Sequence, residues 1–241
     1  IAGMIVGSLP FAHYLAMVRG GWRGLLHDPQ VRWFIILIVG LVLLLCWHLM
    51  QKGLGLGDAL RQASFNGVSI MTGTGYVSAN FSAWGGFATT ILLIVMFIGG
   101  CGGSTTCGIK VFRLQVLAGT AKVQVNRLLR PHAVVLAYYN KRPVSIEVMD
   151  SVMGFFYLYI LGFVVIALFL GMTGLDFVTA LSGAATSISN VGPGLGEVIG
   201  AEGNFSSIPD SAKWVMSFAM ILGRLEIFTV LVMLAPGFWQ R

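Results

Sequence analysis

The chain has 241 residues, of which 56% are hydrophobic and 10% are charged, and its formal net charge is +6. An ordinary soluble domain has about 25% charged residues. The mean hydropathy of +0.85 excludes a water-soluble fold, because one soluble domain cannot bury so much apolar surface. The three cysteines lack the CxxC pairing of zinc and redox motifs and read as free thiols.

Apolar segments long enough to approach a bilayer crossing occur along the whole chain. A spanning helix needs about 20 apolar residues, and the clearest candidates are 33–50, 84–98, 153–172 and 214–234. The chain opens on Ile1, with neither a charged n-region nor a small-residue cleavage site ahead of the first span. We therefore expect no signal peptide, and we expect the sequence to be a piece of a larger protein.

Basic residues gather in three places and so predict the topology. Three arginines precede the first span, Arg241 follows the last, and the segment between the second and third spans holds Lys110, Arg113, Lys122, Arg127, Arg130, Lys141 and Arg142. The loops after the first and third spans instead carry the acids Asp58, Asp176, Glu197, Glu202 and Asp210. The positive-inside rule places the basic segments in the cytoplasm, so each unit leaves the cytoplasm on one helix and returns on another.

The two outer loops, 58–79 and 176–200, are rich in Ser, Thr and Gly, and the apolar stretch within each is shorter than a full span. Segments of this kind are typical of re-entrant structure. Each loop predicts a short Asp-led helix (58–71 and 176–188) and then a Gly-rich turn, with Gly75 and Gly192 at equivalent places. The order of span, short helix, turn, span and basic exit therefore occurs twice.

The Gly-rich turns suit a partly dehydrated cation. Backbone carbonyls can replace its water shell without the tight binding of a carboxylate, and Gly tolerates the conformations that turn carbonyls inward. Irregular backbone is permitted at membrane depth where it lines a water-filled cavity or is buried in protein. The repeated turns therefore indicate passage of a monovalent cation.

Glycine and hydroxyl residues also crowd the segment 99–108. Each Gly costs a helix about 1 kcal/mol relative to Ala, which predicts a break in the helix there. The alternative is a stripe of small residues that lets neighbouring helices pack closely.

Arg224 falls near the middle of the last predicted span. An ionised side chain at that depth costs at least about 2.5 kcal/mol, so we expect Arg224 to face an internal cavity or a partner. Glu226 is two residues away, on a different helix face, and need not pair with it. The alternative is that Arg224 snorkels to the interface or braces loop carbonyls.

These residues carry a family resemblance. The turn Thr72-Gly73-Thr74-Gly75-Tyr76, the Gly-rich segment 97–110, the turn 190–194 and the segment 221–226 resemble the Trk/Ktr/HKT potassium-uptake family, closest to its bacterial TrkH/TrkG membrane subunits. The resemblance implies an all-α membrane protein with a potassium-channel-like fold of repeated helix, re-entrant pore loop and helix units. Four such repeats would surround one pore. Residues 28–142 and 143–241 would be the third and fourth, and 1–27 would hold the end of the preceding repeat's last helix and a cytoplasmic loop.

The resemblance also implies site residues. Two quarters of a selectivity filter would come from Thr72, Gly73, Thr74, Gly75, Tyr76, Asn190, Val191, Gly192 and Pro193, with K⁺ bound at Gly73, Thr74, Asn190 and Val191. An intramembrane loop beneath the filter would act as a gate together with the opposing charge of Arg224. The residues implied for this loop are Gly99, Gly100, Gly102, Gly103, Ser104, Thr105 and Gly108.

The function implied is that of a pore-forming subunit that conducts K⁺ inward across a bacterial inner membrane. K⁺ would be the transported ion, with no covalently bound cofactor, no catalytic residue, no enzyme activity and no nucleic-acid partner. The partners implied are membrane lipid, a second copy in a homodimer and a TrkA-like cytosolic ring of nucleotide-binding regulatory subunits. The alternative is a Na⁺- or H⁺-coupled secondary transporter, although such proteins usually have inverted repeats and the charge pattern here gives parallel ones.

Overall fold

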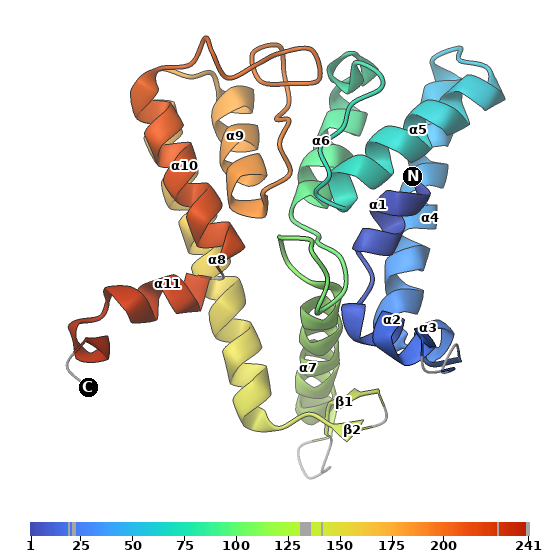
Figure 1. Ribbon diagram of the computed structural model, residues 1–241, viewed down its shortest axis with the longest axis vertical. Helices are drawn as coiled ribbons and strands as arrows, with labels where there is room; N and C mark the ends of the chain where they lie inside the picture. The colour runs from blue at the N-terminus through green and yellow to red at the C-terminus, as the bar shows by residue number, and fades with distance from the viewer. Residues whose placement is uncertain (19, 21–22, 131–135, 141, 226, 240–241) are drawn as a thin grey trace.

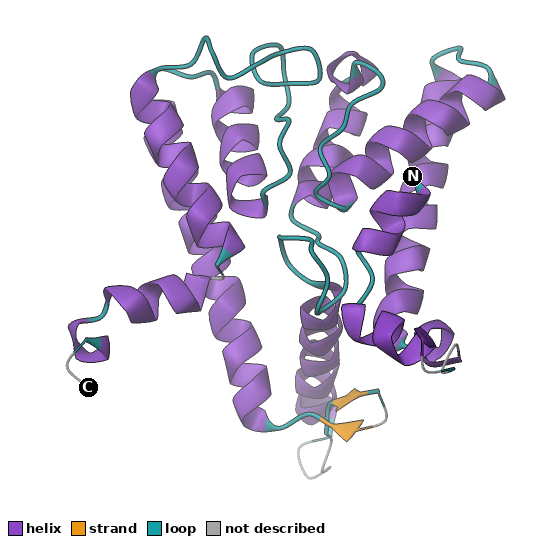
Figure 2. Ribbon diagram, in the orientation of Figure 1, coloured by secondary structure: helices purple, strands orange, loops and turns teal. Residues whose placement is uncertain are grey.

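The computed structural model describes residues 1–18, 20, 23–130, 136–140, 142–225 and 227–239; Arg19, Lys141, Glu226 and Arg241, used in the sequence argument, lie outside these ranges. Helices dominate, which confirms the predicted class (Figures 1 and 2). The elements are α1 (Ala2–Gly7), α2 (Phe11–Val18), α3 (Arg23–His27), α4 (Pro29–Gln51), α5 (Leu56–Met71), η1 (Phe81–Trp84), α6 (Gly86–Met96), α7 (Val111–Leu129), β1 (Tyr138–Tyr139), β2 (Arg142–Pro143), α8 (Ile146–Met172), α9 (Phe177–Ser189), α10 (Asp210–Arg224), α11 (Ile227–Leu234) and η2 (Pro236–Phe238). The two short antiparallel strands are an addition to the predicted helices.

Two units with the same order of elements make up most of the molecule. The first unit consists of α4, α5, a turn and α6, and the second of α8, α9, a turn and α10. Figure 1 shows α5 and α9 running from the upper end of the molecule toward its centre, in the same sense in both units. Buried apolar residues form two clusters, one mainly in the first unit and one mainly in the second, and Phe97 packs against both; its ring centroid lies 4.9 Å from that of Phe163.

The first and third predicted spans are single long helices, and both are long and apolar enough to cross a membrane. Helix α4 starts after Asp28, which caps it by accepting a hydrogen bond from the Gln30 amide at 2.8 Å, with Pro29 in the first turn. Helix α8 starts after Ser145, whose hydroxyl accepts from the Val148 amide at 3.4 Å. These polar caps place both helix starts earlier than hydropathy alone predicts.

The second predicted span, 84–98, is wrong as a single crossing. Helix α6 has only 11 residues and stops at Met96, and α7 begins at Val111 on the other side of the Gly-rich segment. Figure 1 shows α7 below α6, alongside the lower part of α8. The predicted break is therefore present, and the chain becomes helical again in α7 after it.

The last predicted span, 214–234, is also not straight. Helices α10 and α11 meet at 104°, and Arg224 ends α10 instead of lying within one long helix. Gly223 lies so close to α9 that a Cβ there would be 1.9 Å from the Ile188 carbonyl oxygen. The end of α10 therefore lies in close contact with α9, and no Pro in the sequence marks the bend.

The N-terminal segment, for which the resemblance implied the end of a preceding helix and a loop, forms two short helices. They are α1 and α2, separated at Ser8 to Pro10, where Pro10 has no N–H to continue the hydrogen bonding of α1. The Ser8 amide instead bonds to the Ile5 carbonyl at 3.0 Å and closes the first helix. This joint contacts the Gly-rich loop described below.

The short helices α5 and α9 lie within two residues of the predicted bounds. Burial of apolar surface does not drive helix association in lipid, so close approach of small residues becomes important. Gly67 of α5 lies against Leu41 and Leu45 of α4, where a Cβ would be 3.3 Å from the nearest side-chain atom. Helix α9 buries a run of small residues, Ser182 to Ala185, between α8 and α10.

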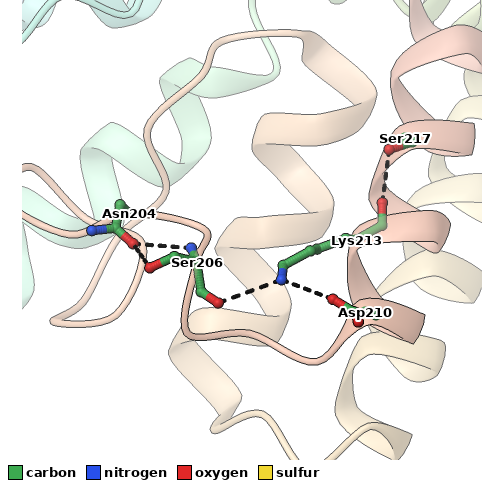
Figure 3. Close-up of polar contacts among 5 residues, drawn as sticks. All are labelled: Asn204, Ser206, Asp210, Lys213 and Ser217. Carbon is green, nitrogen blue, oxygen red and sulfur yellow. Dashed lines mark hydrogen bonds and ion pairs between the residues drawn. The ribbon is translucent and has the colours of Figure 1, made fainter.

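The connection between the second turn and α10 is ordered by short-range polar contacts, which Figure 3 shows. Lys213 donates to the Asp210 carboxylate at 2.9 Å and to the Ser206 carbonyl at 3.4 Å. The Asn204 side chain accepts from the Ser206 amide at 2.9 Å. These contacts lie at the N-terminal end of α10, which begins at Asp210.

Replacing the α9 cap gives a first test of the fold. The Asp176 carboxylate accepts from the Thr179 amide at 3.1 Å, and this bonding lowers the pKa of Asp176 below its ordinary value. Asp176→Ala is expected to cost about 1 kcal/mol. Because the folded-state pKa is lowered, the cap stabilises above the unfolded pKa near 4 and its contribution is lost as pH falls through the folded value. Thermal unfolding across pH 3 to 7 checks this, with Asp176→Asn as the variant that keeps the cap but loses the pH dependence.

Candidate functional site

The turns that follow α5 and α9 lie directly against each other. A Cβ on Gly75 would be 2.2 Å from the Val191 carbonyl oxygen, and one on Gly73 would be 3.7 Å from the Asn190 carbonyl oxygen. A Cβ on Gly192 would likewise be 3.8 Å from the Cα of Gly75. The structure thus brings together the two Gly-rich turns that the sequence placed in equivalent positions.

Left-handed backbone shapes both turns. Gly73 and Gly75 have φ of 64° and 75°, and Gly192 has φ of 115°. Asn190 adopts φ of 53° although it has a side chain, and its Nδ2 donates to the Met220 carbonyl of α10 at 3.0 Å. The side-chain bond stabilises a conformation that few residues other than Gly adopt.

Carbonyl oxygens in these turns are available to a ligand. Within the described part of the chain, no hydrogen bond is accepted by the carbonyls of Thr72, Gly73, Thr74, Gly75, Tyr76, Asn190, Val191, Gly192 and Pro193. Backbone carbonyls in folded proteins are nearly always paired with protein or water. Nine such oxygens on two touching turns are therefore suited to bind a cation.

The amides of the same turns face the short helices instead. Thr74 donates to the Ser69 carbonyl at 2.9 Å, and Val191 donates to the Thr186 carbonyl at 3.0 Å. Because both helices end at the turns, the partial negative charge of each helix C-terminus also lies next to the carbonyls. Neither turn carries an acidic or basic side chain, so carbonyl oxygens and helix ends dominate the local field.

The segment 99–108 forms a loop whose two ends are joined by backbone hydrogen bonds, and this junction is the neck of the loop. Gly99 donates to the Ile109 carbonyl at 2.9 Å, and Ile109 donates to the Phe97 carbonyl at 2.8 Å. A Cβ on Gly99 would be 2.0 Å from the Cys107 carbonyl oxygen, and Gly108 has φ of 75°. Close approach and left-handed backbone therefore require Gly at both ends of the loop.

Residues distant in sequence hold this loop in place through hydrogen bonds. The Cys101 amide donates to the Ser8 carbonyl at 3.0 Å, and the Gly102 amide donates to Gln30 Oε1 at 2.8 Å. The Thr105 hydroxyl donates to the Gly7 carbonyl at 2.9 Å. Sequence reasoning missed Ser8 and Gln30, because no local pattern indicates contacts made across the fold.

Arg224 contacts the loop from the other unit. Its Nη1 donates to the Thr105 carbonyl at 2.9 Å and lies 3.3 Å from Cys107 Sγ. The same side chain lines a cavity of about 250 Å³, which is also bordered by Ser104, Thr105, Thr106, Cys107, Gly108, Lys110, Arg113, Phe155, Tyr159, Gly223 and Ile227. Arg224 therefore faces a cavity and also braces the loop. The sequence had offered these two arrangements as alternatives, and the side chain has both.

A substitution at the neck tests how the loop is built. Gly99→Ala places a methyl group against the Cys107 carbonyl and is expected to destabilise the protein by about 1 to 3 kcal/mol, the usual range for overpacking. The matched control is Gly86→Ala in α6, where a Cβ meets nothing within 4 Å. Thermal unfolding in detergent checks the difference, and equal melting temperatures for both variants would contradict the neck geometry.

Fold and site together define an integral membrane protein built from parallel helix, re-entrant loop and helix units. The family model named TrkH, described as a cation transport protein, matches residues 16–240. The chain belongs to this family, which confirms the resemblance found in the sequence.

Individual relatives agree with this assignment. The chain is 43% identical over 238 residues to the Trk system potassium uptake protein TrkI of Halomonas elongata, covering 99% of this chain and 48% of the relative. It is 40% identical over 237 residues to TrkH of Vibrio parahaemolyticus, covering 95% and 47%. The crystal structure of the potassium transporter TrkH from Vibrio parahaemolyticus matches with a TM-score of 0.88 at 38% identity, covering 98% of this chain and 51% of that one. The chain thus spans about half the length of these relatives.

Proposed function

We propose that this chain is half of the pore-forming membrane subunit of a K⁺ uptake system and conducts K⁺ inward down its electrochemical gradient. Residues 28–142 and 143–241 would be the third and fourth of four repeats, and residues 1–27 would end the second. The observation that carries the proposal is the pair of touching turns, whose nine carbonyls accept no hydrogen bond within the described residues. Relatives named as potassium uptake proteins support the choice of ion.

The two turns would supply two quarters of the selectivity filter. K⁺ would bind near Gly73 and Thr74 of the first turn and near Asn190 and Val191 of the second. Carbonyl oxygens replace the hydration shell of K⁺ while binding it weakly enough to release it. Tyr76, at 68% exposed, and Gly192, also exposed, could then contact the other two repeats, which would close the filter.

The loop 99–108 and Arg224 would form the gate beneath this filter. Two unit charges 4 Å apart repel by about 4 kcal/mol at an effective dielectric constant of 20, so a guanidinium beside the path opposes a passing cation. The hydrogen bond from Arg224 to the Thr105 carbonyl links this charge to the loop. Movement of the loop would then move the barrier with it.

The same proposal implies where the protein lies and which partners it has. The protein would lie in a bacterial inner membrane, surrounded by lipid, with K⁺ as cargo and no chemical step. A homodimer would rest on a TrkA-like cytosolic ring of nucleotide-binding subunits. Helix α7 and the β1–β2 hairpin are our candidate contact for that ring, because the segment 62–146 contains no acidic residue and the far end of α7 exposes Leu128 and Leu129.

Growth at low external K⁺ tests the proposal in cells. The complete subunit is expected to restore growth to bacteria that lack K⁺ uptake, and Gly192→Ser is expected to lose this activity because Gly192 has φ of 115°. Gly171→Ser is the matched control, since a Cβ there meets nothing within 4 Å. Failure of the unaltered protein to restore growth, or saturable uptake of an organic solute instead, would favour the coupled-transporter alternative.

A further inference from the structure

The two pore helices carry a hydroxyl residue at equivalent places behind the filter. Ser69 of α5 lies six residues before Gly75, and Thr186 of α9 lies six residues before Gly192. Both side chains are fully buried. The hydrogen bonding of the two hydroxyl groups nevertheless differs, and this changes how the amides of Gly75 and Gly192 are bound.

In the second unit, the pore helix secures two consecutive amides. The Thr186 carbonyl accepts from the Val191 amide at 3.0 Å, and Thr186 Oγ1 accepts from the Gly192 amide at 2.9 Å. Because a trans peptide directs its N–H and C=O in opposite directions, fixing the Gly192 amide toward α9 also directs the Val191 carbonyl away from α9. That carbonyl is one of the proposed K⁺ ligands.

In the first unit, the Ser69 carbonyl alone accepts the two amide hydrogen bonds that the carbonyl and the hydroxyl of Thr186 accept separately in the second unit. The Ser69 carbonyl accepts from Thr74 at 2.9 Å and from Gly75 at 3.3 Å, and also from the Thr72 hydroxyl at 3.3 Å. Ser69 Oγ is buried and has no hydrogen-bond partner among the described residues. The Gly75 amide, which orients the Thr74 carbonyl, therefore has only a long, shared bond.

Among the amides that pore-helix side chains bind, the two units differ at the filter glycine. Three residues after each filter glycine, a pore-helix side chain binds the amide of the turn in both units. Ser78 donates to Asn66 Oδ1 at 3.0 Å, and Leu195 donates to Ser182 Oγ at 2.9 Å. The amides of Ser78 and Leu195 are thus bound alike in the two units, whereas the amides of Gly75 and Gly192 are not.

We infer that Thr186 is a positioning residue that sets the direction of the Val191 carbonyl through the Gly192 amide, and that the Ser69 hydroxyl has no such role. The inference rests on the proposed function, since it assigns unequal rigidity to two quarters of the same filter. The quarter after α5 is the more deformable one. Loss of the Thr186 hydroxyl makes the quarter after α9 deformable as well.

The test compares Thr186→Val with Ser69→Ala in the complete subunit, reconstituted in liposomes. Valine keeps the shape of Thr186 without its hydroxyl, so the K⁺/Na⁺ permeability ratio is expected to fall about tenfold. Ser69→Ala removes an unused hydroxyl at the equivalent place, and its ratio is expected to stay within about twofold of the unaltered protein. Thr186→Ser keeps the hydroxyl and is expected to restore most of the preference.

Thermal unfolding in K⁺ and in Na⁺ separates positioning from simple stability. Positioning predicts that Thr186→Val loses the extra stabilisation by K⁺ over Na⁺, whereas a merely structural role lowers both melting temperatures equally. An unchanged permeability ratio in Thr186→Val, or an equal loss in Ser69→Ala, overturns the inference. If the unaltered protein shows no K⁺ preference, the proposed function fails first, so the two failures are distinguishable.

Discussion

Gly75→Ala is expected to remove most of the preference for K⁺ over Na⁺. Gly75 has φ of 75°, and a Cβ there would be 2.2 Å from the Val191 carbonyl oxygen. The added methyl group must therefore displace a proposed K⁺ ligand of the neighbouring turn, while the left-handed backbone of a residue with a Cβ costs roughly 1 to 2 kcal/mol. We expect the permeability ratio to fall at least about tenfold, which corresponds to about 1.4 kcal/mol of lost discrimination.

The control for this variant is Gly40→Ala within α4, where a Cβ meets nothing within 4 Å. Ion-replacement measurements on the complete subunit would compare the two. Gly40→Ala is expected to keep the K⁺ preference. A Gly75→Ala protein that folds, conducts and still prefers K⁺ as the unaltered protein does would show that the contact between the turns has no part in selectivity.

Arg224→Gln is expected to raise K⁺ flux about tenfold. The substitution removes the charge beside the cavity but leaves an amide group that can donate to the Thr105 carbonyl, now bound by Arg224 at 2.9 Å. A barrier lowered by about 1.4 kcal/mol gives this factor. That is well below the roughly 4 kcal/mol of repulsion between unit charges at 4 Å. Tracer K⁺ uptake into liposomes measures the change.

Two further variants separate the charge of Arg224 from its contact with the loop. Arg224→Lys keeps the charge and is expected to keep flux low, whereas Arg224→Ala removes charge and donor together. If charge sets the barrier, Gln and Ala raise flux alike. High flux in Ala with unaltered flux in Gln would instead assign the gate to the hydrogen bond with Thr105.

Much of the fold could be predicted from the sequence, because it depends on the residue composition of single segments. The apolar stretches of the outer loops were too short to cross the membrane, and the Asp-led segments became α5 and α9 within two residues of their predicted bounds. The crowding of Gly between Gly99 and Gly108 correctly predicted a broken helix, because several glycines in ten residues cannot sustain one. In each case the signal was local to the segment.

Features that depend on contacts between residues distant in sequence could not be predicted from single segments. The bend after Arg224 lies where Gly223 approaches Ile188 of another helix, and no Pro marks it in the sequence. The loop depends on Ser8 and Gln30, which are distant in sequence. The unequal bonding of Ser69 and Thr186 was equally invisible, because both are small hydroxyl residues at matching positions.

The most direct test of the account is the reversal potential of the complete subunit in a planar bilayer or liposome patch under opposed K⁺ and Na⁺ gradients. The account predicts a reversal potential close to the K⁺ equilibrium value, and a shift toward the Na⁺ value in Gly75→Ala. A current carried equally by K⁺ and Na⁺, or no current at all from a folded protein, would contradict the assignment of the two touching turns as a K⁺ filter.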